Sequence, residues 1–252
     1  MVARRLSTRM GGTAMNPLLI RRRGMMMGES DVKDDILTFT TDTGNSTIRL
    51  VKNSEPAPIS LEYSTDGTIW QSYTIGDTIN LTNPNDFVKL RGDNQITFNR
   101  NNFYSFVMTG SLYGSGDVTS LFNLIGGNYS LITIPSLFNG CEALKSAPNL
   151  PSTSIGDWGY YRTFRGCSNL TQAPFLPCNG SIDAQMYREL FFQCSKLNYV
   201  KIAATIISDQ IWSLSSWLAG VAATGIVECN PNLNIPINSP NGIPSGWTRV
   251  DL

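Results

Sequence analysis

Alternation of apolar and polar residues marks the first part of the chain as β-structure. Residues 48–51 and 59–63 place apolar side chains at every second position, the period of a strand with one buried face. Asp66-Gly67 separates segment 59–63 from segment 69–73, and such a pair is typical of a tight turn between strands. Further candidate strands are 36–40, 78–81, 87–90, 95–98 and 103–108. We therefore predict a small antiparallel β-sandwich of about seven or eight strands over residues 31–113.

A second pattern, with a much longer period, begins near residue 137. Segments 137–151 and 163–177 share the form Phe-x-Gly-Cys-x-x-Leu-x-x-Ala-Pro-x-Leu-Pro, and segment 190–200 keeps its first half. The cysteines of the three units are 26 and then 27 residues apart. A fixed period in the twenties is typical of a solenoid, in which each unit buries its apolar face only against its neighbours. We predict a short solenoid over residues 114–229.

Inside one unit, Tyr160, Phe164 and Cys167 fall at positions i, i+4 and i+7, and the same spacing recurs one unit later. This spacing predicts an apolar stripe on a short helix. Pro174 and Pro177 then exclude a helix, so the rest of the unit is predicted to be extended. The fold class is therefore mainly β with short helices. The predicted core of the repeats consists of Phe138, Cys141, Leu144, Phe164, Cys167, Leu170, Phe191, Cys194 and Leu197.

Both ends of the repeat region are predicted to be degenerate. Segment 116–122 is predicted to be an imperfect first unit, and segment 216–221 a last one, with Val221 at the cysteine position. Residues 230–252 are rich in Asn, Pro and Ser. Because a solenoid needs an atypical end unit to close its core, we predict a C-terminal cap there.

Residues 1–30 differ in composition from everything that follows. Residues 1–28 hold six arginines and no acid, a charge of +6, whereas residues 29–252 hold 13 basic and 19 acidic residues, a charge of −6. Methionine adapts to irregular apolar grooves and arginine binds carboxylates, so we expect an extended docking arm on a partner protein rather than a disordered tail. Nucleic acid is not the expected partner, because methionine and leucine interrupt the arginines. The predicted docking residues are Arg4, Arg5, Arg9, Arg21, Arg22, Arg23, Met25, Met26 and Met27.

Candidate chemistry is limited by the absence of histidine, which removes the usual general base and the commonest zinc ligand. A cysteine-only metal site is the remaining alternative, but Val221 fills the same repeat position, which favours buried hydrophobes. We therefore predict no catalytic residue, no cofactor and no metal. Aromatics such as Trp158 and Tyr161 can stack on sugar rings, although core packing is the commoner fate. No apolar run reaches about 18 residues, so no membrane span is expected.

The repeat form quoted above resembles the BspA-like leucine-rich repeats of gut Bacteroidetes and of the phages that infect them. Segments 61–79, 88–94, 108–110 and 241–248 resemble flanking pieces of the same proteins, so the resemblance covers roughly residues 60–252. It implies a leucine-rich-repeat solenoid. It also implies a cell-surface or virion protein that binds proteins or glycans.

Together, the arm and the resemblance imply a non-enzymatic virion protein of a crAss-like phage: a head fibre, a capsid decoration or a tail component. Residues 1–30 would contact capsid, portal or tail proteins, and the repeats would bind a host glycan or protein. A homo-oligomer is expected, with a trimer as in other fibres. One alternative is a bacterial cell-surface adhesin. Another is a carbohydrate-active enzyme, which would need two acids about 5–10 Å apart.

Overall fold

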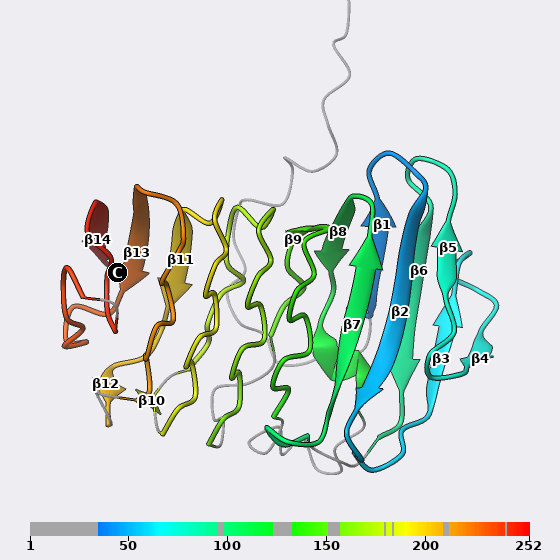
Figure 1. Cartoon of the computed structure of the whole chain (residues 1–252), viewed down its shortest axis with the longest axis horizontal. Coiled ribbons are helices and arrows are strands. Elements are labelled where there is room, and N and C mark those ends of the chain that lie inside the picture. Colours follow the sequence, from blue (N-terminus) through cyan, green and yellow to red (C-terminus); the bar gives the residue numbers. More distant parts are fainter. Residues whose placement is uncertain are drawn as a thin grey trace, which may run out of the picture. The chain divides into compact units, whose positions relative to one another are not determined.

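The computed structural model describes residues 35–94, 98–122, 133–150, 157–178, 180–182, 184–208, 212–239 and 241–252. All of them belong to one unit of the chain, residues 33–252. The predicted arm, with its nine docking residues, lies outside the described residues. The described part is mainly β and contains no α-helix, so it also contains no helix able to cross a membrane (Figure 1).

Residues 37–115 form two antiparallel sheets. One sheet has the strand order β4-β3-β6-β1-β8 and continues into β9, and the other has the order β5-β2-β7. Seven of the predicted strands overlap β1 to β7, and the predicted strand 95–98 lies mostly outside the described residues. The strands are β1 (Leu37–Thr41), β2 (Ser46–Asn53), β3 (Leu61–Ser64), β4 (Gln71–Tyr73), β5 (Ile79–Leu81), β6 (Phe87–Gly92), β7 (Phe103–Thr109) and β8 (Leu112–Ser115).

Side chains on the inner faces of these two sheets share one core. Burial alternates along β1 and β2, as the sequence pattern predicts. Phe39 of β1 packs edge-on against Phe106 of β7, with ring centroids 5.3 Å apart. The Tyr73 hydroxyl of β4 accepts a hydrogen bond from the Leu50 N–H of β2 at 2.9 Å, which ties one sheet to the other.

The repeat region is a stack of four coils, which we define as coil 1 (133–141), coil 2 (157–167), coil 3 (184–194) and coil 4 (212–221). Backbone N–H groups alternate between two kinds of acceptor. The Phe164 N–H donates to the Leu190 carbonyl of the next coil at 3.0 Å, whereas the Arg165 N–H donates to the Arg162 carbonyl within its own coil at 3.1 Å. Figure 1 shows the coils side by side, following one another from β7 toward the C-terminal strands.

The predicted short helices are therefore wrong. Each coil is a series of turns in which a left-handed residue recurs every fourth position, as at Trp158 (φ 63°), Arg162 (φ 56°) and Gly166 (φ 75°). A four-residue period places Tyr160 and Phe164 on the same side, as an α-helix would, so the spacing of apolar residues does not distinguish the two. A helix of two turns would leave most of its N–H groups unpaired. The turns instead direct every second N–H to the neighbouring coil.

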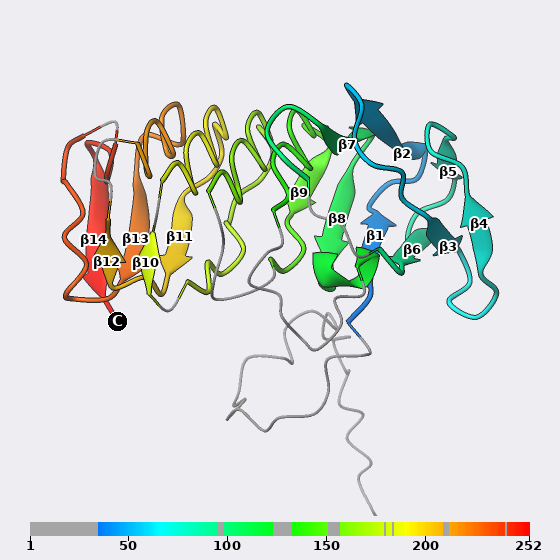
Figure 2. The ribbon, with the colours of Figure 1, turned by 90° about the horizontal axis from the view of Figure 1, so that it is seen from below.

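The opposite side of the stack is strand-like and parallel (Figure 2). Segment 170–176, predicted to be extended, joins the next strand through the Ala173 N–H and the Tyr199 carbonyl at 3.0 Å. A three-stranded parallel sheet of order β11-β13-β14 follows, and β10 pairs with β12. The strands are β9 (Leu144–Ser146), β10 (Ser181–Ile182), β11 (Tyr199–Ile202), β12 (Ile206–Ile207), β13 (Gly225–Cys229) and β14 (Trp247–Asp251).

A column of phenylalanine rings forms the centre of the stack. The rings of Phe106, Phe138, Phe164 and Phe191 lie 5.3, 5.1 and 5.7 Å apart in succession, with interplanar angles of 8°, 9° and 11°. All nine residues predicted for the repeat core have no exposed surface. The column begins in β7, because the Phe106 N–H donates to the Leu137 carbonyl of coil 1 at 2.7 Å.

Segment 116–122, expected to be a first repeat unit, is not the coil that precedes coil 1. It contains a short 3-10 helix, η2 (Val118–Leu121), and the ring of Phe122 packs against Phe98 at 5.7 Å. Phe106, rather than Phe122, therefore lies beneath Phe138. The sequence comparison missed this because β7 carries the column position without the Gly-Cys that follows it in the repeats.

At the far end of the stack, the chain after residue 230 packs Leu233, Ile243 and Trp247 into the core. Arg249 of β14 holds this segment in place. Its guanidinium donates to the carbonyls of Asn230, Pro231 and Leu233 at 2.9–3.0 Å.

Candidate functional site: an arginine–aromatic surface

Outward positions of the coils differ from unit to unit, although the inward positions repeat. The ladder of hydrogen bonds fixes which outward positions are equivalent. Coils 1 and 4 carry small neutral residues there, whereas coils 2 and 3 carry arginine, glutamate and an aromatic ring. In coil order, the equivalent residues are Ser136, Arg162, Glu189 and Ser216, and then Asn139, Arg165, Phe192 and Ala219. Stacking does not require the residues of coils 2 and 3, since coils 1 and 4 stack without them.

Glu189 lies at the centre of this difference. Its carboxylate accepts two hydrogen bonds from Arg162, with Nε–Oε2 at 2.9 Å and Nη2–Oε1 at 3.1 Å. The Nε atoms of Arg165 and Arg188 lie 3.3 and 3.7 Å from the same carboxylate. The Glu189 side chain is only 14% exposed. Three guanidinium groups thus share one carboxylate, which leaves a net charge of +2 (three minus one) on these four side chains.

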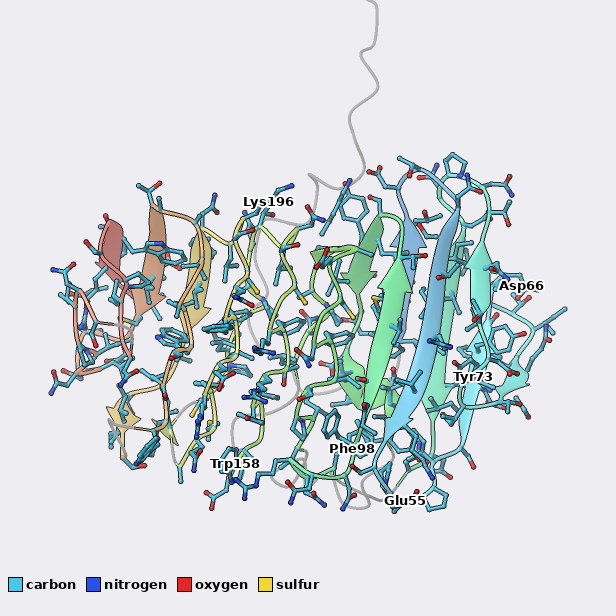
Figure 3. The ribbon with its side chains drawn as sticks, viewed as in Figure 1. Glu55, Asp66, Tyr73, Phe98, Trp158 and Lys196 are labelled. Carbon is cyan, nitrogen blue, oxygen red and sulfur yellow. The ribbon has the colours of Figure 1, made fainter. Side chains whose placement is uncertain are left out.

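Aromatic rings support the same arginines. Arg188 lies between two tryptophans, with its Cζ 5.9 Å from the ring of Trp158 and 5.6 Å from that of Trp212. Arg100, from the loop before β7, lies over Trp158 at 4.5 Å. The result is a row, Arg100–Trp158–Arg188–Trp212, that crosses successive coils. In Figure 3, Trp158 and Lys196 lie at opposite edges of the stack.

Two further pairs complete the set. Arg162 lies over the ring of Tyr161 at 4.6 Å, and Arg165 lies over that of Phe192 at 5.1 Å. A ring face attracts a guanidinium through its quadrupole and uses none of the five N–H donors. The arginine–aromatic surface, as we call it, consists of Arg100, Trp158, Tyr161, Arg162, Arg165, Arg188, Glu189, Phe192 and Trp212.

Several donors in this surface have no acceptor. The Nε atoms of Arg165 and Arg188 are buried, and neither makes a hydrogen bond within the described part of the chain. The 3.3 Å contact of Arg165 with Glu189 is thus an ion pair without hydrogen-bond geometry. Arg188 donates through Nη1 to the Gln185 side chain at 2.7 Å. The exposed part of the Arg165 guanidinium, beside excess positive charge, has the chemistry of an anion-binding surface.

A second arginine–tryptophan pair lies in the antiparallel region. Arg91 of β6 lies 3.9 Å over the ring of Trp70 and forms a 2.8 Å ion pair with Glu62 of β3. Both Arg91 and Glu62 border an open depression of about 540 Å³ that also includes Tyr73. Here each positive charge has its own carboxylate, so the pair is neutral and its donors are engaged.

The residues predicted from sequence lie elsewhere. The docking residues fall outside the described residues, and the nine core residues are enclosed in the stack, where no ligand contacts them. Burial raises the pKa of the Cys194 thiol to about 12, and the pKa of Cys141 and Cys167 is raised by burial as well, so these thiols stay protonated. Tyr160 is buried in the core, as core packing predicts, but Trp158 belongs to the surface.

Sequence reasoning missed Arg162, Arg165, Arg188 and Glu189. A signal was present, because an alignment of the units at their outward positions shows charge only in coils 2 and 3. A short helix would place the same residues outside, so the signal lies in the difference between the units and not in the conformation of the coil.

Comparison of the chain with protein-family models, with curated proteins and with solved structures finds no match. What the surface can do therefore follows from its own chemistry. In the described ranges, no group of three His, Cys, Asp or Glu side chains lies close enough together to hold a metal ion.

Proposed function

We propose that this protein is a non-enzymatic structural component of a bacteriophage virion that presents a binding surface on a leucine-rich-repeat solenoid. In this proposal the stacked coils are BspA-like repeats, and the two antiparallel sheets form a β-sandwich that closes the N-terminal end of the stack. Head fibre, capsid decoration and tail component are the three positions that suit such a protein.

The observation that carries the proposal is the contrast between a repeating interior and a non-repeating exterior. The interior columns repeat Phe, Cys and Leu through coils 1 to 3. The exterior concentrates its charged residues on coils 2 and 3, with Trp212 of coil 4 and Arg100 beside them. Extended repeat arrays commonly use such an exterior to bind macromolecules.

The carboxylates on the stack support binding rather than catalysis. Glu189 contacts three guanidinium groups and accepts two hydrogen bonds from that of Arg162. Hydrogen bonds from Tyr199 and Lys201 lower the pKa of Glu228. A glycosidase needs one carboxyl with a raised pKa as general acid. Burial raises the pKa of Asp117, but the Asp117 side chain caps η2 by accepting the Thr119 N–H at 2.7 Å.

Attachment to the particle is assigned to residues 1–30. Their six arginines and six methionines suit a groove with acidic and apolar walls on a capsid, portal or tail protein. The proposal includes a homo-oligomer, with a trimer as the expected form, so that several repeat domains project together.

The test is incorporation into particles. We expect a chain lacking residues 1–30 to remain folded and soluble but to be absent from purified virions, measured by mass spectrometry against the major capsid protein. A matched variant with Arg21, Arg22 and Arg23 replaced by glutamine keeps the length of the arm and should reduce incorporation. Normal amounts of the truncated chain in particles would contradict the docking role. Recovery of the full chain in the envelope of uninfected bacteria would favour the adhesin alternative.

A further inference from the structure

We infer that the arginine–aromatic surface binds a carboxylated polysaccharide, an inference that rests on the proposed function and names the ligand class of its display surface. The charge of the surface favours an anionic ligand. Arg162, Arg165 and Arg188 share Glu189, and Arg100 adds a fourth positive charge at Trp158. Asp157, the exposed neighbour of Trp158, has no ion pair with these arginines in the described part of the chain. The surface therefore holds excess positive charge, although residues 29–252 as a whole carry a charge of −6.

The orientation of the guanidinium groups favours a carboxylate. The rings contact the guanidinium groups by their faces and engage no N–H donor. The Arg165 side chain makes no hydrogen bond within the described ranges, and it is 35% exposed. A guanidinium with a free edge matches the two oxygens of a carboxylate in a bidentate arrangement. A neutral sugar would leave this excess charge without a counter-ion.

The arginines and tryptophans of this surface form a row. The row Arg100–Trp158–Arg188–Trp212 crosses one coil after another, so it suits a linear chain with repeated charged groups. Trp212, at the end of this row, is 49% exposed. Ser215 and Ser216, in coil 4, provide neutral hydroxyl groups beside it, which suit the hydroxyls of a sugar.

Two other macromolecules fit less well. A protein partner that covered this surface would bury three arginines that share one carboxylate, which carries a large desolvation cost. Single-stranded nucleic acid needs a continuous cationic track along its phosphates. Coils 1 and 4 flank the charged coils 2 and 3 and end such a track with the neutral residues Asn139, Ser216 and Ala219. A polysaccharide with spaced carboxylates tolerates neutral gaps and stays partly hydrated.

The experiment measures binding of the purified full-length chain by calorimetry. The probes are oligosaccharides of polygalacturonate, alginate and hyaluronate, which carry carboxylates on different rings. Fully methyl-esterified polygalacturonate is the matched control, because it differs only in charge, and oligo-dT tests for general polyanion binding. We expect at least one carboxylated polymer to bind, the ester not to bind, and added salt to weaken the complex.

Variants locate the site. We expect Arg165→Gln and Arg188→Gln each to weaken binding about tenfold or more, as loss of a charge-assisted hydrogen bond does. Arg165→Lys keeps the positive charge but loses the planar pair of N–H donors, so it should weaken binding as well. Arg91→Gln removes an arginine from the other tryptophan pair and should leave binding unchanged. The thermal unfolding midpoint of each variant checks that it is folded.

Three results would overturn the inference: no binding to any of the three polymers, equal binding of the methyl ester, or equal weakening by Arg91→Gln. Tighter binding of oligo-dT than of all three polymers would replace the polysaccharide with nucleic acid. These outcomes are separate from those of the proposed function. Particle incorporation depends on residues 1–30, so it can fail while purified protein still binds the polymer, and the reverse also holds.

Discussion

The antiparallel sheets and the coil stack form one continuous core, but their backbone N–H and C=O groups form hydrogen bonds in different patterns. In the sheets, strands such as β2 and β7 pair over seven residues, and burial alternates along each strand. In the coils, every second N–H serves the neighbouring coil and the others close turns. The core of the sheets therefore mixes many residue types, whereas the core of the stack is built from columns of the same residue. A substitution in one coil is therefore expected to disturb first the packing of the two coils beside it.

The exteriors of the two regions differ as well. The arginine–tryptophan pair of the sheets is neutralised one-to-one by Glu62, whereas three arginines of the stack share Glu189. Repetition inside the stack leaves its outward positions free to vary. This difference explains why the unmatched charge occurs on the coils.

The largest expected effect comes from removing a ring in the middle of the column. Phe164 stacks on both Phe138 and Phe191, and its side chain is fully buried. Phe164→Ala should lower the free energy of unfolding by about 3–5 kcal/mol, measured by urea denaturation. Phe175→Ala is the matched control, because Phe175 is 48% exposed, and its effect should stay within about 0.5 kcal/mol. Equal effects of the two substitutions would contradict the column.

Alkaline pH should weaken the stack through its cysteine column. Burial raises the pKa of Cys194 from 9.0 to about 12 in the folded state, whereas the unfolded chain keeps the ordinary value. Below pH 9 the thiols are protonated in both states, so this contribution is fully present. Above pH 9 only the unfolded chain releases the protons, so stability falls by about 1.4 kcal/mol per pH unit for each such thiol. Cys167→Val should reduce this slope, and a slope that stays unchanged would show that the thiol is not enclosed.

The sequence was sufficient for β1 to β7 and for the identity of the buried repeat residues, but not for β8 or for the conformation of the coils. Alternation in segments 48–51 and 59–63 predicts strands because only a strand has a period of two. Tyr160 and Phe164 are four apart in both a helix and a turn series, so their spacing does not choose between them. The left-handed residues that decide the matter include Arg162 and Glu189, residue types with no special preference for that conformation. Their cost is offset by hydrogen bonds to coils that are distant in sequence.

Glu189 is the carboxylate that three arginines of the stack share. Glu189→Gln leaves three arginines beside one another without a counter-charge, and we expect a loss of about 1–2 kcal/mol of stability, measured by urea denaturation. Glu62→Gln breaks the neutral pair of the sheets, whose two side chains are 43% and 46% exposed, and should cost less than about 1 kcal/mol. Equal losses of stability in the two variants would show that the shared carboxylate Glu189 contributes no more to stability than the one-to-one partner Glu62.

The smallest effect tests the backbone of the coils. Gln193 occupies a left-handed position with φ 62°, where coils 1, 2 and 4 have glycine. Glycine adopts this conformation without strain, so Gln193→Gly should stabilise the protein by about 0.5–1 kcal/mol, measured as a rise in the thermal midpoint. A loss of stability would be expected of a regular helix at this position, and it would contradict the turn series.

A double-mutant cycle tests most directly the central claim that each coil is coupled to its immediate neighbours. Phe138→Ala and Phe164→Ala remove two rings that stack at 5.1 Å, and we predict a coupling energy of about 0.5–1.5 kcal/mol. Phe138 and Phe191 lie two coils apart with Phe164 between them, and their coupling should be close to zero. A zero coupling for the adjacent pair, or an equal coupling for the distant pair, would contradict the stack.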